Sequence, residues 1–230
     1  MSAAPNHQTA VEVVIFDVDG TLLDSAPGIV DGFRHAVTAV GLPTPSAESI
    51  RGDLGPPAPY LLAGLGVPPE LIPAAYAAYR EHYRAHGVHQ AEVYPGVLEL
   101  LDTLHARVRL ATATAKLVST AEIFLARHGL DHYFEVIGGS ADGGQQKAEI
   151  IATTLVRLGD PDPRTVIMIG DRHSDLTGAA VCGVRSVGVT WGYGSRNELI
   201  DAGADHLVST PAALLALWPP TRDVEIVARS

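Results

Sequence analysis

The chain has 230 residues, of which 47% are hydrophobic and 18% charged, and this composition excludes a largely disordered chain. Its formal net charge of −10 argues against binding to a nucleic-acid polymer, which requires a basic surface. No apolar run approaches the roughly 18 residues that a membrane span requires. The single cysteine, Cys182, cannot form a disulfide within the chain. We therefore expect a cytoplasmic protein with no membrane or nucleic-acid partner.

Short apolar runs rich in β-branched residues recur along the chain and predict strands that are buried on both faces. These runs cover residues 11–16, 108–112, 134–137, 165–169, 185–190 and 206–208. Helical patterns lie between them, at residues 97–107, 118–128 and 148–158. Strands that alternate with helices of this length predict an α/β fold with a doubly wound parallel sheet.

One long stretch, residues 25–92, contains no convincing strand. Ser25 is a candidate N-cap for a helix that ends near Gly41, and residues 69–86 form a second helical pattern rich in Ala and Tyr. An interruption of this kind predicts a helical cap domain inserted into the α/β core. We expect the core to comprise residues 1–24 and 93–230, and the cap to comprise residues 25–92.

Two pairs of aspartates follow predicted strands directly. Asp17 and Asp19 come after the first strand, and their spacing of two puts both on one side if the strand continues. Asp171 and Asp175 come after the strand at residues 165–169, one helical turn apart. Ligands of open α/β sheets bind beyond the carboxyl ends of the strands. Because hard cations take oxygen ligands, the two pairs predict a Mg²⁺ site, although polar turns and helix caps use the same residues.

Between these pairs, residues 110–116 end a predicted strand with Thr114, Ala115 and Lys116. A strand-to-helix turn with a hydroxyl, free amides and an ammonium is a natural phosphate-binding site. The chain contains only two lysines, Lys116 and Lys147, and both lie next to such elements. Lysine is a compact point charge suited to one phosphoryl oxygen.

The order of these motifs resembles that of the haloacid dehalogenase (HAD) superfamily. Four elements carry the resemblance: the run Asp17-Val18-Asp19-Gly20-Thr21-Leu22, Thr114, Lys147, and the run Gly170-Asp171-Arg172-His173-Ser174-Asp175. The chain is similar to phosphatases of the phosphoglycolate phosphatase-like branch, which carry a helical (C1-type) cap. The loop Gly55-Pro56-Pro57 resembles the cap loop that faces the substrate in that branch.

The resemblance implies catalytic roles for the first pair of aspartates. Asp17 would be the nucleophile that forms a phosphoaspartyl intermediate. Asp19 would protonate the leaving group and then activate the hydrolytic water. Thr114, the backbone amide of Ala115 and Lys147 would bind the phosphoryl oxygens.

The resemblance also implies a Mg²⁺ cofactor. The carboxylates of Asp17 and Asp171 and the backbone carbonyl of Asp19 would bind it, and Asp175 would support this shell. Three carboxylates and a phosphate dianion would bring about five negative charges together, which a low-dielectric pocket does not tolerate unpaired. The expected activity is hydrolysis of a small phosphorylated metabolite, as in a phosphoglycolate phosphatase or a 5′-nucleotidase.

Other functions use similar residues. A phosphosugar mutase of the same superfamily keeps both aspartates, and a signalling receiver module uses acidic residues and a lysine around Mg²⁺ but is about half as long. Dehalogenases and phosphonate-cleaving relatives lack the second aspartate, so Asp19 disfavours those reactions. His82 and His86 have a spacing that zinc sites use, but a solvated helix face is the preferred interpretation. His173 is expected to be an exposed residue of a helix start.

Overall fold

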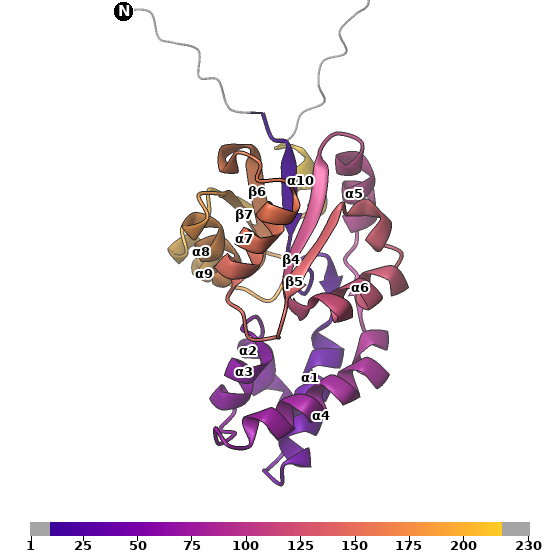
Figure 1. Cartoon of the computed structure of the whole chain (residues 1–230), viewed down its shortest axis with the longest axis vertical. Helices are drawn as coiled ribbons and strands as arrows, with labels where there is room; N and C mark the ends of the chain where they lie inside the picture. Colours follow the sequence, from indigo (N-terminus) through magenta and orange to yellow (C-terminus); the bar gives the residue numbers. More distant parts are fainter. Residues whose placement is uncertain (1–9, 218–230) are drawn as a thin grey trace, which may run out of the picture.

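A computed structural model describes residues 10–217 of the chain. Its central feature is a sheet of six strands, in which every neighbouring pair is parallel (Figure 1). In spatial order the strands are β5 (Val136–Ser140), β4 (Arg109–Leu117), β1 (Val13–Phe16), β6 (Val166–Gly170), β7 (Arg185–Val189) and β8 (His206–Val208). The expected α/β fold with a parallel sheet is confirmed.

Helices cover both faces of this sheet. They are α5 (Val97–His105), α6 (Val118–Arg127), α7 (Lys147–Arg157), α8 (His173–Val181), α9 (Arg196–Asp201) and α10 (Pro211–Leu215), with short 3₁₀ turns η2 (Asp131–Tyr133) and η3 (Pro163–Thr165). Helices α7 and α8 pack on one face, and α5 and α6 pack on the other. The layered order of helix, sheet and helix follows from the alternation along the chain.

Side chains of β1 explain why the sequence of this strand is apolar without interruption. Val13 and Ile15 belong to the hydrophobic cluster beneath α7 and α8, whereas Val14 and Phe16 belong to the cluster beneath α5 and α6. All four are at most 1% exposed. Successive residues of a strand point to opposite faces, so a strand covered on both sides needs apolar residues at every position.

Strand β4 is longer than the sequence predicts. The expected strand ended at residue 112 and passed into a strand-to-helix turn, whereas β4 continues to Leu117 and α6 begins at Val118. Pairing with β5 extends the strand, and the register shifts between Thr114 and Leu117. The end of the segment 110–116, expected to be a strand-to-helix turn, is therefore an irregular strand end, because pairing with a neighbouring strand overrides the local pattern.

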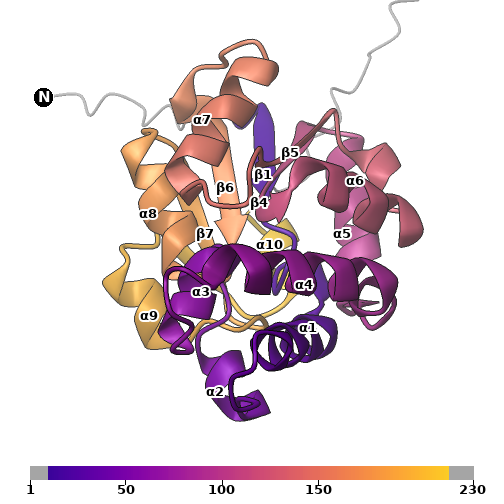
Figure 2. The ribbon, with the colours of Figure 1, turned by 60° about the horizontal axis from the view of Figure 1, so that its bottom comes forward.

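The helical insert lies between two short strands, β2 (Leu23–Asp24) and β3 (Glu92–Val93), which form an antiparallel pair. Its elements are α1 (Ala26–Ala39), α2 (Ala47–Gly52), α3 (Ala58–Gly64), α4 (Ile72–Ala85) and the 3₁₀ turn η1 (Gly87–His89). Helix α4 packs along α1, where the rings of Phe33 and Tyr79 stack with centroids 4.4 Å apart. The insert lies beyond one end of the sheet (Figures 1 and 2). We call residues 25–92 the cap, and the division into two domains stays a prediction.

The strand order places a change of direction beside β1. From β1 the chain goes to β4 and then outward to β5, and it returns to the other side of β1 with β6 before continuing to β7 and β8. Crevices form at the carboxyl ends of strands where the order reverses in this way. Residues that follow β1, β4 and β6 therefore share one crevice. No helix within residues 10–217 is long and apolar enough to cross a membrane.

A pair of leucines on α5 tests the packing of the core. Leu101 is fully buried, whereas Leu98, on the same helix, is 45% exposed. Leu101→Ala should lower the free energy of unfolding by about 2–5 kcal/mol, because it leaves a cavity in a close-packed core. Leu98→Ala should change it by less than about 0.5 kcal/mol. Urea denaturation measures both, and equal losses would contradict the described packing of α5.

Candidate active site

Three strand ends deliver the expected site residues to one place. Asp17 directly follows β1, Thr114 lies near the end of β4, and Asp171 directly follows β6. The amide of Asp17 donates a hydrogen bond to the carbonyl of Ile169 at 2.8 Å, which fixes the first strand end against the third. Lys147 is the first residue of α7 and also reaches this place. The structure thus brings together residues that lie up to 154 positions apart in the sequence.

The Lys147 ammonium lies at the centre of this group. Its Nζ is 2.9 Å from Oδ1 of Asp17 and 2.8 Å from Oδ1 of Asp175, and it donates a hydrogen bond to the carbonyl of Ala113 at 2.8 Å. The side chain is 5% exposed. Burial acts to lower the pKa of Lys147, but the charges of Asp17 and Asp175 raise it more, so the amine stays protonated. Lys147 is therefore a fixed positive charge beside Asp17.

The acidic groups around Lys147 carry more negative charge than the lysine balances. Burial raises the pKa of Asp17 to about 7, against the lowering effect of Lys147, and the charge of Asp175 raises it further. Burial and the charges of Asp175 and Asp17 likewise raise the pKa of Asp171 well above its ordinary value. A site whose carboxyl groups resist ionisation in this way lacks positive charge.

A divalent cation fits this deficit. Asp17, Asp171 and Asp175 each offer a buried carboxylate oxygen, and these oxygens lie within 4.8 Å of one another. The oxygens of Asp17 and Asp175 that face Lys147 accept no well-directed hydrogen bond, so the lysine contacts them as an ion pair only. An all-oxygen donor set is the kind that Mg²⁺ prefers.

The carboxylates of Asp171 and Asp175 have different hydrogen-bond and ion-pair partners. One oxygen of Asp171 accepts a hydrogen bond from Thr21 Oγ1 at 3.1 Å, and the other accepts one from the amide of Tyr193 at 2.7 Å. Asp175 has Lys147 on one oxygen and accepts a hydrogen bond from the amide of Arg172 at 3.0 Å on the other. Asp175 has a cation partner within the chain, whereas Asp171 has only hydrogen-bond donors, and the expected supporting role for Asp175 stays a prediction.

Asp19 points away from the other three carboxylates. Its Oδ2 pairs with Lys116 Nζ at 2.7 Å, and its Oδ1 accepts a hydrogen bond from the hydroxyl of Ser25. The Tyr193 hydroxyl in turn accepts a hydrogen bond from the amide of Ser25 at 2.9 Å. Ser25 was expected to cap α1, but its side chain makes no cap hydrogen bond, because Asp19 takes its hydroxyl. The Asp19 side chain is thus outside the metal cluster, and metal binding by its backbone carbonyl stays a prediction.

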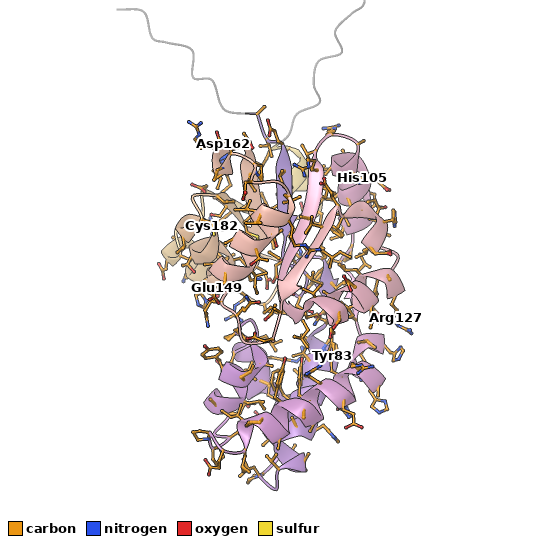
Figure 3. The ribbon with its side chains drawn as sticks, viewed as in Figure 1. Tyr83, His105, Arg127, Glu149, Asp162 and Cys182 are labelled. Carbon is orange, nitrogen blue, oxygen red and sulfur yellow. The ribbon has the colours of Figure 1, made fainter. Side chains whose placement is uncertain are left out.

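The Lys116 ammonium links the core to the cap. It lies 4.6 Å from the ring centroid of Tyr83 on α4 and 4.8 Å from that of Phe124 on α6. Tyr83 lies where the cap faces the core (Figure 3). Contacts of an ammonium with two aromatic faces are favourable, especially where water is excluded. Lys116 therefore pairs with Asp19 and contacts the rings of Tyr83 and Phe124, whereas Lys147 pairs with Asp17.

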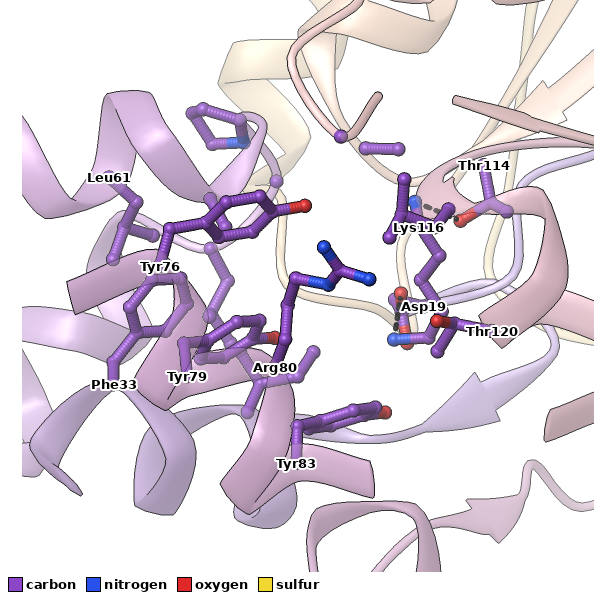
Figure 4. A pocket seen from close by; sticks show the side chains of 18 of the residues that line it. Asp19, Phe33, Leu61, Tyr76, Tyr79, Arg80, Tyr83, Thr114, Lys116 and Thr120 are labelled. Carbon is purple, nitrogen blue, oxygen red and sulfur yellow. Dashed lines mark hydrogen bonds and ion pairs between the residues drawn. The ribbon is translucent and has the colours of Figure 1, made fainter. Parts of the chain in front are cut away.

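A cavity of about 100 Å³ lies between core and cap (Figure 4). Its core side is lined by Asp17, Asp19, Thr114, Ala115 and Lys116. Its cap side includes Gly55, Pro56, Tyr76, Tyr79, Arg80 and Tyr83. Lys147, Asp171 and Asp175 are not among its lining residues, but all three are neighbours of Asp17, which is. Asp17 and Asp19 are the acidic residues that a ligand in this cavity meets.

A family model described as haloacid dehalogenase-like hydrolase matches residues 14–189. The chain belongs to the haloacid dehalogenase-like hydrolase family. The matched span contains all four motifs on which the resemblance was based, so that prediction and the expectation of an enzyme are confirmed.

Named relatives of this hydrolase cover most of the chain. Tyrosine-protein kinase PtkA of Mycobacterium tuberculosis is 40% identical over 206 residues, which span 88% of this chain and 70% of PtkA. Phosphoglycolate phosphatase of Vibrio cholerae is 31% identical over 217 residues, spanning 90% of this chain and 96% of the relative. The crystal structure of a predicted phosphatase from Clostridium acetobutylicum matches with a TM-score of 0.86 at 31% identity and covers 91% of this chain and 98% of that one.

The sequence pointed to the cap loop of this hydrolase but not to α4. Gly55 and Pro56 of the expected loop line the cavity and Pro57 does not, whereas Tyr76, Tyr79 and Tyr83 of α4 line it as well. Their spacing of three and four residues places them on one face of a helix, which is the signal that could have identified them. Predicting that this face meets the active site requires knowledge of how α4 packs on α1.

The three histidines considered from the sequence lie outside the cavity wall. His82 Nε2 is 2.7 Å from Oδ2 of Asp31, and the ring stacks on His35 with centroids 4.3 Å apart. His86 contacts the His82 ring. His173 Nδ1 lies 3.0 Å from Glu198 Oε1, and the side chain is 54% exposed.

Two glycines with the same backbone angle test the close contact around Asp171. Gly20 and Gly41 both have φ +81°, but a Cβ on Gly20 would lie 2.3 Å from Asp171 Oδ2, whereas a Cβ on Gly41 meets nothing within 4 Å. Gly41→Ala should cost about 1–2 kcal/mol of unfolding free energy for the left-handed backbone alone. Gly20→Ala should cost about 1–3 kcal/mol more and displace Asp171. Equal losses of stability, measured by denaturation, would contradict this contact.

Proposed function

We propose that this hydrolase is a Mg²⁺-dependent phosphatase that acts on a small phosphate monoester through a phosphoaspartyl intermediate. The observation that carries the proposal is the pair Asp17 and Asp19 at one cavity, each with its own lysine. Asp17 lies 2.9 Å from Lys147, and Asp19 lies 2.7 Å from Lys116. The relatives named phosphatase support the class of reaction.

In the first step, a carboxylate oxygen of Asp17 attacks the phosphorus atom, and the bond from phosphorus to the ester oxygen breaks. The proton that the leaving oxygen needs comes from the carboxyl group of Asp19. The Thr114 hydroxyl, the Ala115 amide and the Lys147 ammonium bind the phosphoryl oxygens. Lys147 also holds Asp17 in position, because it contacts Asp175 and the Ala113 carbonyl at the same time.

In the second step, Asp19 accepts a proton from a water molecule whose oxygen attacks the phosphorus atom of the phosphoaspartate. The bond between Asp17 and phosphorus breaks, which restores the carboxylate and releases inorganic phosphate. Its contacts with Lys116 and Ser25 hold the Asp19 carboxyl group in place for this step. When bound by Asp17 and Asp171, with Asp175 in support, Mg²⁺ supplies positive charge that offsets the phosphoryl charge.

Transfer of the phosphoryl group to an acceptor other than water is the second candidate function. A phosphosugar mutase uses a sugar hydroxyl as acceptor, and the relative PtkA is named a tyrosine-protein kinase. In either case the attacking oxygen would come from a hydroxyl rather than from water. Release of inorganic phosphate in step with loss of the ester supports hydrolysis, whereas recovery of the label in a second ester supports transfer. A stable phosphoprotein without turnover would instead support a signalling receiver.

Metal removal tests the cofactor. Excess EDTA should lower turnover at least ~100-fold, because the buried carboxylates and the substrate phosphate then lack a balancing cation. Mg²⁺ should restore activity, and Ca²⁺ should restore it poorly, since its looser coordination disturbs in-line attack. EDTA that has been saturated with Mg²⁺ is the control for effects of the chelator itself. Full activity in excess free chelator would refute the proposed cofactor.

Isosteric substitutions separate the roles of the two aspartates. Asp17→Asn should abolish both turnover and the phosphoprotein that is trapped by acid quenching, because the nucleophile is lost. Asp19→Asn should slow turnover about 10²–10⁴-fold through loss of general acid–base catalysis. Nitrophenyl phosphate, whose leaving group needs no proton, should still phosphorylate Asp17 in Asp19→Asn, so that the phosphoprotein accumulates.

Asp201→Asn, at an exposed position of α9, is the matched control and should retain wild-type turnover. Equal loss of activity in Asp17→Asn and Asp19→Asn on every substrate, with no trapped phosphoprotein in either, would contradict the division of roles.

A further inference from the structure

The cap side of the cavity carries two arginines, for which the described residues show no ion pair. Arg80 and Arg84 on α4 both line the cavity. The guanidinium of Arg80 extends from α4 toward the core side, where Asp19 and Lys116 lie (Figure 4). A substrate whose phosphoryl group is at Asp17 would therefore meet Arg80 with its other end.

Three carboxylates of the site already have a lysine as ion-pair partner. Asp17 and Asp175 share Lys147, and Asp19 is paired with Lys116. Within residues 10–217, Arg80 has neither a carboxylate nor a hydrogen-bond acceptor as partner. Its one described contact is with the ring of Tyr76, whose centroid lies 5.7 Å from Cζ. The ring orients the guanidinium by a cation–π contact and leaves its five donors available.

A second polar group of the same wall also lacks a partner. The Tyr83 side chain is buried, and its hydroxyl accepts and donates no hydrogen bond among the described residues. Buried hydroxyls normally have a partner, and those that lack one in an empty pocket are commonly satisfied by a ligand or by water. Tyr79 and Phe33 make the remainder of this wall apolar, which strengthens charge interactions inside the cavity.

The geometry points to Arg80 as a specificity-determining residue that selects phosphate esters with a second anionic group on the leaving alcohol. This inference rests on the proposed function, because it assigns the leaving group to the cap side of the cavity. In the proposed function, Thr114, the Ala115 amide and Lys147 bind the phosphoryl oxygens. Arg80 is not needed there and can bind a carboxylate or a second phosphate of the same substrate. A guanidinium binds such a group through two parallel hydrogen bonds, which a neutral hydroxyl cannot match.

Three esters of similar size test this inference by differing in the charge of the terminal group. They are 2-phosphoglycolate, with a carboxylate; 2-hydroxyethyl phosphate, with a hydroxyl; and O-phosphoethanolamine, with an ammonium. Wild-type kcat/KM, at saturating Mg²⁺, should fall in that order. The step from carboxylate to hydroxyl should be about 10–100-fold, the range expected for a charge-assisted hydrogen bond.

Substitution of Arg80 should remove this order without removing the chemistry. Arg80→Gln should reduce the preference for the carboxylate over the hydroxyl to less than about threefold, chiefly by raising KM for 2-phosphoglycolate. Arg80→Glu should invert the order and favour O-phosphoethanolamine. Arg51→Gln changes an exposed arginine of α2 that does not line the cavity, and should keep the wild-type order. Binding of the three esters to Asp17→Asn and to its double variant with Arg80→Gln, measured by calorimetry, gives the same comparison without turnover.

The outcomes separate this inference from the proposed function. Hydrolysis of all three esters with an order that Arg80→Gln and Arg80→Glu leave unchanged would overturn the inference alone. A uniform loss on all three esters would also overturn it, because Arg80 would then act on the common phosphoryl group. Absence of phosphate release from every ester by the wild type would overturn the proposed function, and with it the inference.

Discussion

The active site depends on one buried ammonium group. Lys147 contacts Asp17 after β1, Asp175 on α8 and the carbonyl of Ala113 on β4, and so connects three parts of the chain that no local interaction brings together. Two carboxylates this deeply buried would be strongly destabilising without a cation between them. The sheet supplies the positions, and this lysine offsets the cost of burying the Asp17 carboxylate at the crevice.

Around this centre the site is built in two layers with different partners. The inner layer holds Asp17, Asp171 and Asp175 with Lys147, all from the α/β part. The outer layer holds Asp19, whose partners are Lys116 and Ser25, the residue that precedes the first cap helix. The outer layer therefore contacts the cap directly, through Ser25 and the ring of Tyr83. With this arrangement, the cap residues that line the cavity can differ between related proteins while Asp17, Asp171, Asp175 and Lys147 keep their contacts.

The residues of the inner layer could be predicted from the sequence, whereas the α4 residues that line the cavity could not. Asp17 and Asp171 follow uninterrupted apolar strands, so their positions depend on local pattern and on the rule that parallel strands end together. The end of β4 was predicted too early, because its last residues are ordered by pairing with β5 rather than by their own propensity. Tyr76, Arg80 and Tyr83 face the cavity only because α4 packs along α1, and no local feature of residues 69–86 specifies that contact. The sequence also predicted that the Ser25 side chain caps α1. It does not, because its hydroxyl donates to Asp19, and that tertiary contact has no signal in the local sequence.

The scarcity of lysine has a consequence for covalent modification of the protein. Its two lysine side chains are 5% and 8% exposed, and each pairs with an aspartate of the candidate site. Acylation of a surface lysine is often harmless, but this chain has no lysine side chain on which acetylation would be neutral. Any acetyl group on a lysine would remove the charge beside Asp17 or Asp19, so enzymatic or chemical acetylation that reached these amines would inactivate the enzyme. The ring contacts of Lys116 with Tyr83 and Phe124 and the burial of Lys147 limit access to both amines in the folded state.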